Sequence, residues 1–167
     1  MVGTRNLAAS GIGSPHDPLD TSWAESCQRS IGDETPATEM PVSCALEAVP
    51  VPVADVDRAK RFYTHRLGFR VDYDTQFDTG CRIVQLTPPG SACSIVIGKG
   101  IVDSEPGSVS GMLLVVDDIR AAHSWLTAQG VPASEIQSVS GSAGGSFLRF
   151  SDPDGNGWTM QESPRAH

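Results

Sequence analysis

Apolar and polar residues follow a pattern along this chain that occurs twice. In each copy an apolar run ends at an aspartate, and apolar residues then recur at helical spacing until a glycine, over 49–68 and again over 112–130. Aligning the two copies places Asp55 on Asp118. The other matched positions are Val56 with Ile119, Ala59 with Ala122, and Phe62-Tyr63 with Trp125-Leu126. Such an internal repeat indicates two similar supersecondary units.

The aspartate of each copy predicts the start of a helix, because its side chain accepts hydrogen bonds from the unpaired N–H groups of the first turn. Apolar residues three and four positions apart are then typical of a helix with one buried side. Glycine fits the left-handed position just after a helix end. The pattern therefore predicts helices between Asp55 and Gly68 and between Asp118 and Gly130. The larger helix residues expected in the core are Phe62, Tyr63 and Trp125.

Each predicted helix is followed by three strand-like segments that are separated by Gly-, Pro- and Asp-rich turns. The predicted strands span 69–74, 81–87 and 92–98 in the first copy, and 134–139, 146–151 and 158–162 in the second. One strand, one helix and three strands, taken twice, give an α+β fold of two tandem βαβββ modules.

Residues 1–43 differ from the rest, since Ser, Gly, Pro, Thr, Asp and Glu dominate and no periodicity is present. Such a segment buries too little apolar surface to offset the entropy lost on ordering it, so we expect a flexible tail. Met40, just before the patterned sequence, is an alternative start of translation. The folded domain is predicted over 44–163, with modules at about 45–100 and 108–162.

Composition narrows the classes of partner. The formal net charge is −8, and the 12 Lys and Arg residues are scattered, which disfavours nucleic acid because phosphate binding needs clustered cations. No apolar stretch approaches the ~18 residues of a membrane helix, and no signal peptide is evident, so a soluble cytoplasmic protein is expected. The four cysteines form no C-x-x-C pair, which indicates free thiols rather than a zinc site.

Two phrases carry a specific resemblance: A-D-V-D-R-A-K-R-F-Y-T-H-R-L-G-F at 54–69 and F-S-D-P-D-G-N-G-W at 150–158. The first resembles the opening helix, and the second the last hairpin, of the vicinal oxygen chelate superfamily. That family comprises glyoxalases, bleomycin-resistance proteins and extradiol dioxygenases. The resemblance covers residues 45–162 and implies eight strands curled into a half-barrel around a cleft, together with a homodimer.

Enzymes of that family bind a divalent metal ion in the cleft, through a His on the first strand and a Glu on the last strand of each module. Counting from the capping aspartates and from Asn156, the corresponding residues here are Ala48, Ser94, Gly111 and Thr159. None of these is a strong metal ligand, so no metal cofactor is expected. Glu47 and Glu162 flank these positions, and a strand bulge would be needed to bring either into the cleft.

The histidines offer no substitute set of ligands. His16 and His167 lie near the chain ends, and the repeat places His65 and His123 on helix surfaces. The segment 152–157 matches the first half of a calcium-binding loop, but Ser163 stands where a bidentate Glu is needed, so a hairpin turn is predicted. The stretch 141–145 is expected to form a lid or rim over the cleft.

Strand alternation predicts a mostly apolar cleft with a few neutral polar groups. Arg82, Gln85 and Arg149 lie on central strands and are expected either to orient a ligand or to take an ordinary surface or ion-paired role. The predicted cleft residues are Ala48, Pro50, Arg82, Gln85, Ser94, Val96, Gly111, Leu113, Arg149, Thr159 and Gln161. This surface suits a small organic, even aromatic, ligand, so the leading hypothesis is a metal-free binding protein that sequesters an antibiotic or metabolite. The alternatives are a lyase, isomerase or dioxygenase with unusual chemistry, and a regulatory or structural domain with an empty cleft.

Overall fold

The computed structural model describes residues 42–139 and 145–163 of the chain. Nearly all of the predicted tail, with the alternative start at Met40, lies outside these ranges, as does most of the predicted lid at 141–145. The elements in chain order are β1 (Ala48–Pro50), α2 (Val56–Arg61), η1 (Phe62–Arg66), β2 (Arg70–Gln76), β3 (Arg82–Thr87), β4 (Ser94–Lys99), β5 (Met112–Val116), α3 (Ile119–Ala128), β6 (Gln137–Ser138), β7 (Ser146–Ser151) and β8 (Gly157–Glu162). The prediction of an α+β fold with two βαβββ modules is confirmed.

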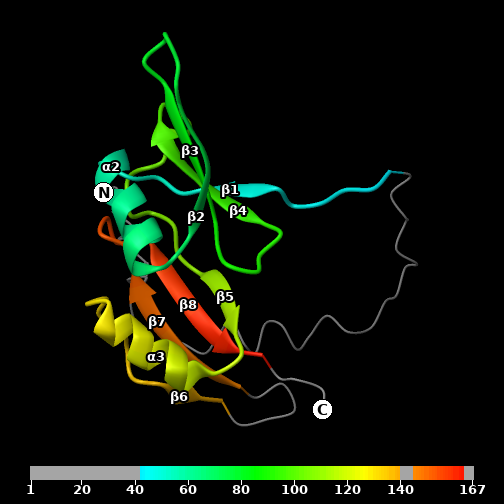
Figure 1. Ribbon diagram of the computed structural model, residues 1–167, viewed down its shortest axis with the longest axis vertical. Coiled ribbons are helices and arrows are strands. Elements are labelled where there is room, and N and C mark those ends of the chain that lie inside the picture. The colour runs from blue at the N-terminus through cyan, green and yellow to red at the C-terminus, as the bar shows by residue number, and fades with distance from the viewer. Residues whose placement is uncertain (1–41, 140–144, 164–167) are drawn as a thin grey trace, which may run out of the picture. The chain divides into compact units, whose positions relative to one another are not determined.

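The strands form two four-stranded sheets, with strand orders β1-β4-β3-β2 and β5-β8-β7-β6 (Figure 1). In each sheet the first strand pairs in parallel with the last, and the remaining pairs are antiparallel. The sheets are curled and do not close into a barrel. Their edge strands β1 and β5 are not hydrogen-bonded to each other.

Both helices begin as the sequence predicts. The Asp55 carboxylate accepts a hydrogen bond from the N–H of Arg58, and that of Asp118 accepts from Arg120 and Ala121. The first helix ends as a π-helical turn, η1, in which the N–H of Leu67 donates to the carbonyl of Phe62. Glycines with positive φ follow both helical segments, with values of 68° at Gly68 and 70° at Gly130. The helix boundaries therefore follow from local chemistry.

Each helix packs on one face of its sheet, which leaves the other face open. In the first sheet the helix-facing residues are buried and include Val84, Leu86, Ile95 and Ile97. Residues that alternate with them point the other way, because successive strand side chains point to opposite faces. We call these surfaces, turned away from the helices, the open faces of the two sheets.

Aromatic rings join the two modules on the helix-facing side. Tyr63 of η1 lies 5.9 Å, centroid to centroid, from Trp158 of β8, and Phe69 lies 6.0 Å from the same ring. Phe150 stacks on Trp158 at 6.2 Å. Tyr63 is fully buried and Trp158 is 2% exposed. One core therefore serves both modules, and large aromatic side chains contribute much of its apolar area.

A buried polar cluster lies beside these rings, built around Asp152 in the turn between β7 and β8. Its carboxylate accepts four hydrogen bonds: from the Tyr63 hydroxyl at 2.7 Å, from the Asn156 side chain at 2.8 Å, and from the N–H groups of Asp154 and Asn156. Trp158 Nε1 donates to the Tyr63 oxygen at 3.3 Å. Burial, and then the neighbouring Asp152, raises the pKa of Tyr63, so its phenol keeps the proton that it donates.

The same cluster ties the turn to the backbone of both modules. Asn156, which has no exposed surface, donates to the carbonyl of Pro52 at 2.9 Å and accepts from the N–H of Val109 at 3.2 Å. The prediction of a turn at 152–157 agrees with the structure, in which no helix flanks the segment. Its aspartate and asparagine also hold the modules together.

One predicted strand is shorter than expected. The sequence predicts a strand over 134–139, whereas β6 covers only Gln137–Ser138. Ala133 forms an isolated bridge opposite Phe150, and Gln137 then lies opposite Phe147. The two pairings differ in register by one residue, so the ladder is interrupted between them.

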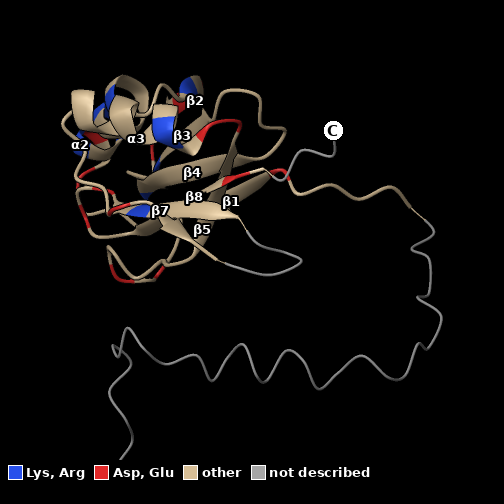
Figure 2. Cartoon of the chain, turned by 90° about the horizontal axis from the view of Figure 1, so that it is seen from below, with Lys and Arg blue, Asp and Glu red and all other residues tan. Residues whose placement is uncertain are grey.

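Arg82 and Gln85, each expected either to orient a ligand in the cleft or to take a surface or ion-paired role, do not share a face of β3. These residues are three apart in one strand, so their side chains point to opposite faces. Arg82 instead bonds Asp74 at 2.8 Å and Asp57 of α2 at 2.9 Å, on the helix-facing side. Lys60 reaches Asp74 at 2.8 Å. In Figure 2 charged residues lie on α2 and β3, whereas β4 and β5 are largely uncharged.

Among the helices that the structure describes, none has the length and apolar character of a membrane span.

Replacing Tyr63 by phenylalanine should lower the free energy of unfolding by ~1–3 kcal/mol, because it leaves Asp152 without one donor and Trp158 N–H without its acceptor. Urea unfolding followed by tryptophan fluorescence measures this. Tyr73→Phe is the matched control, since Tyr73 is 44% exposed, and it should change stability by less than about 0.5 kcal/mol. Equal effects of the two changes would contradict the role given to the buried cluster.

Replacing Arg82 by methionine should cost about 1 kcal/mol of stability in low salt, and less in high salt, as for a surface ion-pair network. Its hydrogen bonds hold the pKa of Asp74 well below the ordinary value. The contribution is therefore present above the unfolded pKa of about 3.9 and is lost as the pH falls further. Denaturation at several pH values measures it, with Arg149→Met as control. A salt-independent loss would contradict the ionic explanation.

Candidate functional site

The open face of the first sheet brings together most of the residues predicted for the first half of the cleft. Ala48 lies opposite Ser94, Pro50 opposite Val96, and Val96 opposite Gln85. Tyr73 extends this row from β2, where it lies opposite Gln85. The row Tyr73–Gln85–Val96–Pro50 therefore crosses all four strands, with one neutral amide among apolar side chains.

The open face of the second sheet has the same organisation. Arg149 lies opposite Thr159, which lies opposite Leu113, and Gln161 lies between Phe147 and Val115 in the next row. Leu113 and Val115 are 54% and 64% exposed. Gly111 lies two residues before Leu113, the partner of Thr159, so Gly111 and Thr159 are not directly opposite each other. The arginine of this face takes the position that Gln85 holds in the first.

The side chains at the four positions that correspond to the metal ligands of family enzymes are poor metal ligands. Ala48 and Gly111 carry no donor atom, and the Ser94 hydroxyl is already engaged by Thr87 at 2.7 Å and Gln85 at 3.2 Å. Within 42–139 and 145–163, no three His, Cys, Asp or Glu side chains converge as a ligand set.

The two flanking glutamates do not supply the missing metal ligands. Glu162 turns to the helix side, where its Oε1 accepts from the N–H of Ile119 at 3.4 Å. Glu47 is exposed and lies just before β1. His65 and His123 lie on η1 and α3.

A β-bulge brings Asp72 onto the open face, which sequence reasoning missed. Val71 lies opposite Leu86 and Tyr73 lies opposite Gln85, so Asp72 is the extra residue between two consecutive partners. A bulge redirects side chains that strict alternation would place elsewhere. The Asp72 carboxylate accepts a hydrogen bond from the Thr87 hydroxyl and pairs with Arg70 at 2.9 Å. Asp74, which alternation places on the same face as Asp72, bonds Lys60 and Arg82 on the helix side.

Arg149 is held differently from the other arginines of the strands. Its guanidinium carbon lies 5.1 Å from the centroid of the Phe147 ring, a cation–π geometry. Within the described ranges it forms no ion pair, whereas Arg70 and Arg82 both do. It is a cation available to a ligand.

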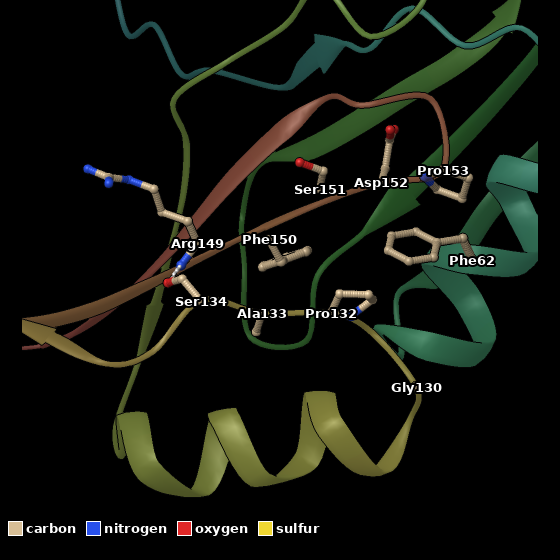
Figure 3. A pocket seen from close by; sticks show the side chains of 10 residues that line it. All are labelled: Phe62, Gly130, Pro132, Ala133, Ser134, Arg149, Phe150, Ser151, Asp152 and Pro153. Atoms are coloured by element: carbon tan, nitrogen blue, oxygen red, sulfur yellow. Dashed lines mark hydrogen bonds between the residues drawn. The ribbon is translucent and has the colours of Figure 1, made fainter. Parts of the chain in front are cut away.

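A groove of about 680 Å³ lies elsewhere, between η1 and the segment that follows α3 (Figure 3). Phe62, Pro132 and Pro153 give it apolar walls. Of the predicted cleft residues only Arg149 borders this groove, and its side chain extends away from Phe62 in Figure 3. The groove and the open faces are therefore separate candidate surfaces.

The chain is similar in sequence and fold to proteins of one superfamily. The family model described as the Glyoxalase/Bleomycin resistance protein/Dioxygenase superfamily matches residues 45–160. TnmS3, an antibiotic binding protein from Streptomyces sp. CB03234, is 32% identical over 74% of this chain and 98% of its own, with a TM-score of 0.66. A superfamily member from Sphaerobacter thermophilus DSM 20745 is 30% identical over 72% of this chain and 98% of its own, with a TM-score of 0.64.

A curated relative is more distant. The YetH protein of Bacillus subtilis (strain 168) is 24% identical over 118 residues, which cover 70% of this chain and 97% of YetH. The family match takes in both modules, the repeated helices and the turn at 152–157. The chain belongs to the glyoxalase/bleomycin resistance protein/dioxygenase superfamily.

Proposed function

We propose that the protein is a metal-free binding protein that sequesters a small organic molecule, such as an antibiotic or a metabolite, on the open faces of its sheets. The observation that carries the proposal is the makeup of those faces. Apolar residues, hydroxyls and amides line them, together with Asp72 and with Arg149, which forms no ion pair within the described residues. The positions at which family enzymes bind metal hold Ala48, Ser94, Gly111 and Thr159. Apolar surfaces with a few oriented polar groups are typical of sites for organic ligands.

Two further observations support the proposal. TnmS3, 32% identical to this chain, is an antibiotic binding protein. Cys44, Cys81 and Cys93 are all unpaired thiols, which fits a reducing compartment such as the cytoplasm.

We also propose that the protein is a homodimer. Leu113 and Val115 point from the same face of the edge strand β5 and are among the more exposed large apolar residues. Neighbouring exposed apolar side chains on a strand with a free edge are typical of an interface. A second copy of the chain would cover them and would lie next to Thr159 and Gln161.

Binding should raise the melting temperature, because a ligand that binds only the folded state adds about 2.7 kcal/mol at a hundredfold excess over its Kd. Thermal denaturation with a panel of aromatic antibiotics measures the shift. Val96→Arg, on the open face, should abolish it, whereas Pro132→Arg, in the groove, should leave it unchanged. The reverse pattern would move the site to the groove, and no shift with any compound would refute ligand binding.

Elemental analysis of protein purified without chelators should find transition metals well below one ion per chain. A stoichiometric zinc, nickel, iron or manganese ion would contradict the metal-free proposal and favour a lyase, isomerase or dioxygenase.

Replacing Val115 by arginine should convert the dimer into a monomer, because each interface would then bury two unpaired cations. Analytical ultracentrifugation measures the mass. Phe77→Arg is the control, since Phe77 is 46% exposed in the turn between β2 and β3, and this variant should remain a dimer. A dimeric Val115→Arg protein would rule out β5 as the interface.

A further inference from the structure

A chain of hydrogen bonds runs along the open face of the first sheet and ends at the bulged Asp72. The Thr87 hydroxyl donates to Asp72 Oδ2. Thr87 and Ser94 share a hydrogen bond of 2.7 Å between their hydroxyl oxygens, and Gln85 Nε2 donates to Ser94 Oγ at 3.2 Å. Four side chains from β2, β3 and β4 thus form one polar line across the sheet.

The direction of every hydrogen bond in this line is fixed by its anionic end. A hydroxyl has a single proton to donate, and Thr87 gives its own to Asp72. The Thr87 oxygen must therefore accept from Ser94, and the Ser94 oxygen must in turn accept from Gln85. An ionised carboxylate only accepts, so the order cannot reverse.

Asp72 remains ionised at neutral pH. Its side chain is 20% exposed and pairs with Arg70 at 2.9 Å. The Thr87 hydrogen bond, with further contributions from Arg70 and Gln85, lowers the pKa of Asp72 from its ordinary value. The amide nitrogen of Gln85 donates to Ser94, the next group of the line.

The amide of Gln85 is consequently held in one orientation. Its nitrogen faces inward along the polar line, so its carbonyl oxygen, Oε1, is the group left to meet a ligand. No residue in the described ranges donates to that oxygen. Tyr73 and Val96 lie on either side of Gln85 in the same row, and Pro50 lies beyond Val96.

We propose that Gln85 is the specificity-determining residue of the open face, and that it selects ligands with a hydroxyl or N–H donor on an aromatic or apolar body. The body would lie over Tyr73, Val96 and Pro50, and the donor would bond Gln85 Oε1. The inference rests on the proposed function, because it takes the open face as the binding surface. A carbonyl or ether oxygen at the same place would face another acceptor and would be disfavoured.

A pair of probes that differ only in the donor tests this. 2-Naphthol carries a hydroxyl that its methyl ether, 2-methoxynaphthalene, lacks. The protein should bind 2-naphthol about fivefold more tightly, which corresponds to one net hydrogen bond. Intrinsic fluorescence titration of the full-length protein gives both dissociation constants.

Three variants locate the preference. Gln85→Met should bind both probes within about twofold of each other, because the acceptor is gone and the apolar contacts remain. Thr87→Val should also reduce the preference, since it breaks the line that orients the amide without touching the ligand. Gln129→Met, at the end of α3 and outside the open faces, is the control and should keep the full preference.

A second measurement needs no ligand. In a ¹H–¹⁵N spectrum the side-chain amide signals of Gln85 should move in Thr87→Val, whereas those of Gln161 should not. Unmoved Gln85 signals would overturn the oriented line.

Other outcomes also separate the two proposals. Equal affinity for the probes, or a preference that survives Gln85→Met, would overturn the role of Gln85 while leaving ligand binding intact. Failure of both probes to bind at millimolar concentration would also overturn the inference, and the proposed function would then be decided by the antibiotic panel.

Discussion

The buried carboxylate of Asp152 is the constraint on which the arrangement of the modules depends. An ion of this kind is tolerated in a core only when its oxygens are fully hydrogen-bonded. Here two donors come from the turn backbone, one from Asn156 and one from Tyr63 of the other module. Each bond is directional, so the carboxylate fixes both the turn and the position of η1. The aromatic rings around Trp158 contribute buried apolar area, and the directional bonds of the polar cluster fix the geometry.

The two faces of each sheet differ in their side chains: the helix-facing side is fixed by the core and its polar cluster, and the open face is not. A network of ion pairs lies on the helix side, where Arg82 connects α2 to β2 and β3. The open faces carry mostly neutral side chains, together with Asp72 and with Arg149, which forms no ion pair in the described part of the chain. A ligand can therefore dock on the open faces without breaking a contact that holds the core together. Because the open faces do not hold the core together, equivalent positions on them can carry different residues, as Gln85 and Arg149 do.

The sequence predicted the features that depend on local chemistry. Helix starts at Asp55 and Asp118, the ends at Gly68 and Gly130, and the bounds of β7 all follow from patterns a few residues long. Side-chain direction was predicted less well. Arg82 and Gln85 were placed on one face although their spacing forbids it, and Trp125, expected in the core, is 40% exposed. The bulge at Asp72 and the bonds of Asp152 to the other module depend on tertiary pairing, which no local pattern encodes.

The bulge also bears on the polarity of the proposed binding surface. A metal ion is an electrophile, so it binds the oxygens of a ligand. The polar line that ends at Asp72 has the opposite polarity, because an anion at one end leaves an acceptor, Gln85 Oε1, at the other. In the proposed site the first sheet thus offers an acceptor to ligand donors, and Arg149 of the second sheet offers a cation to ligand oxygens. A surface of this polarity favours molecules with hydroxyl or N–H groups over molecules that chelate a metal ion through two adjacent oxygens.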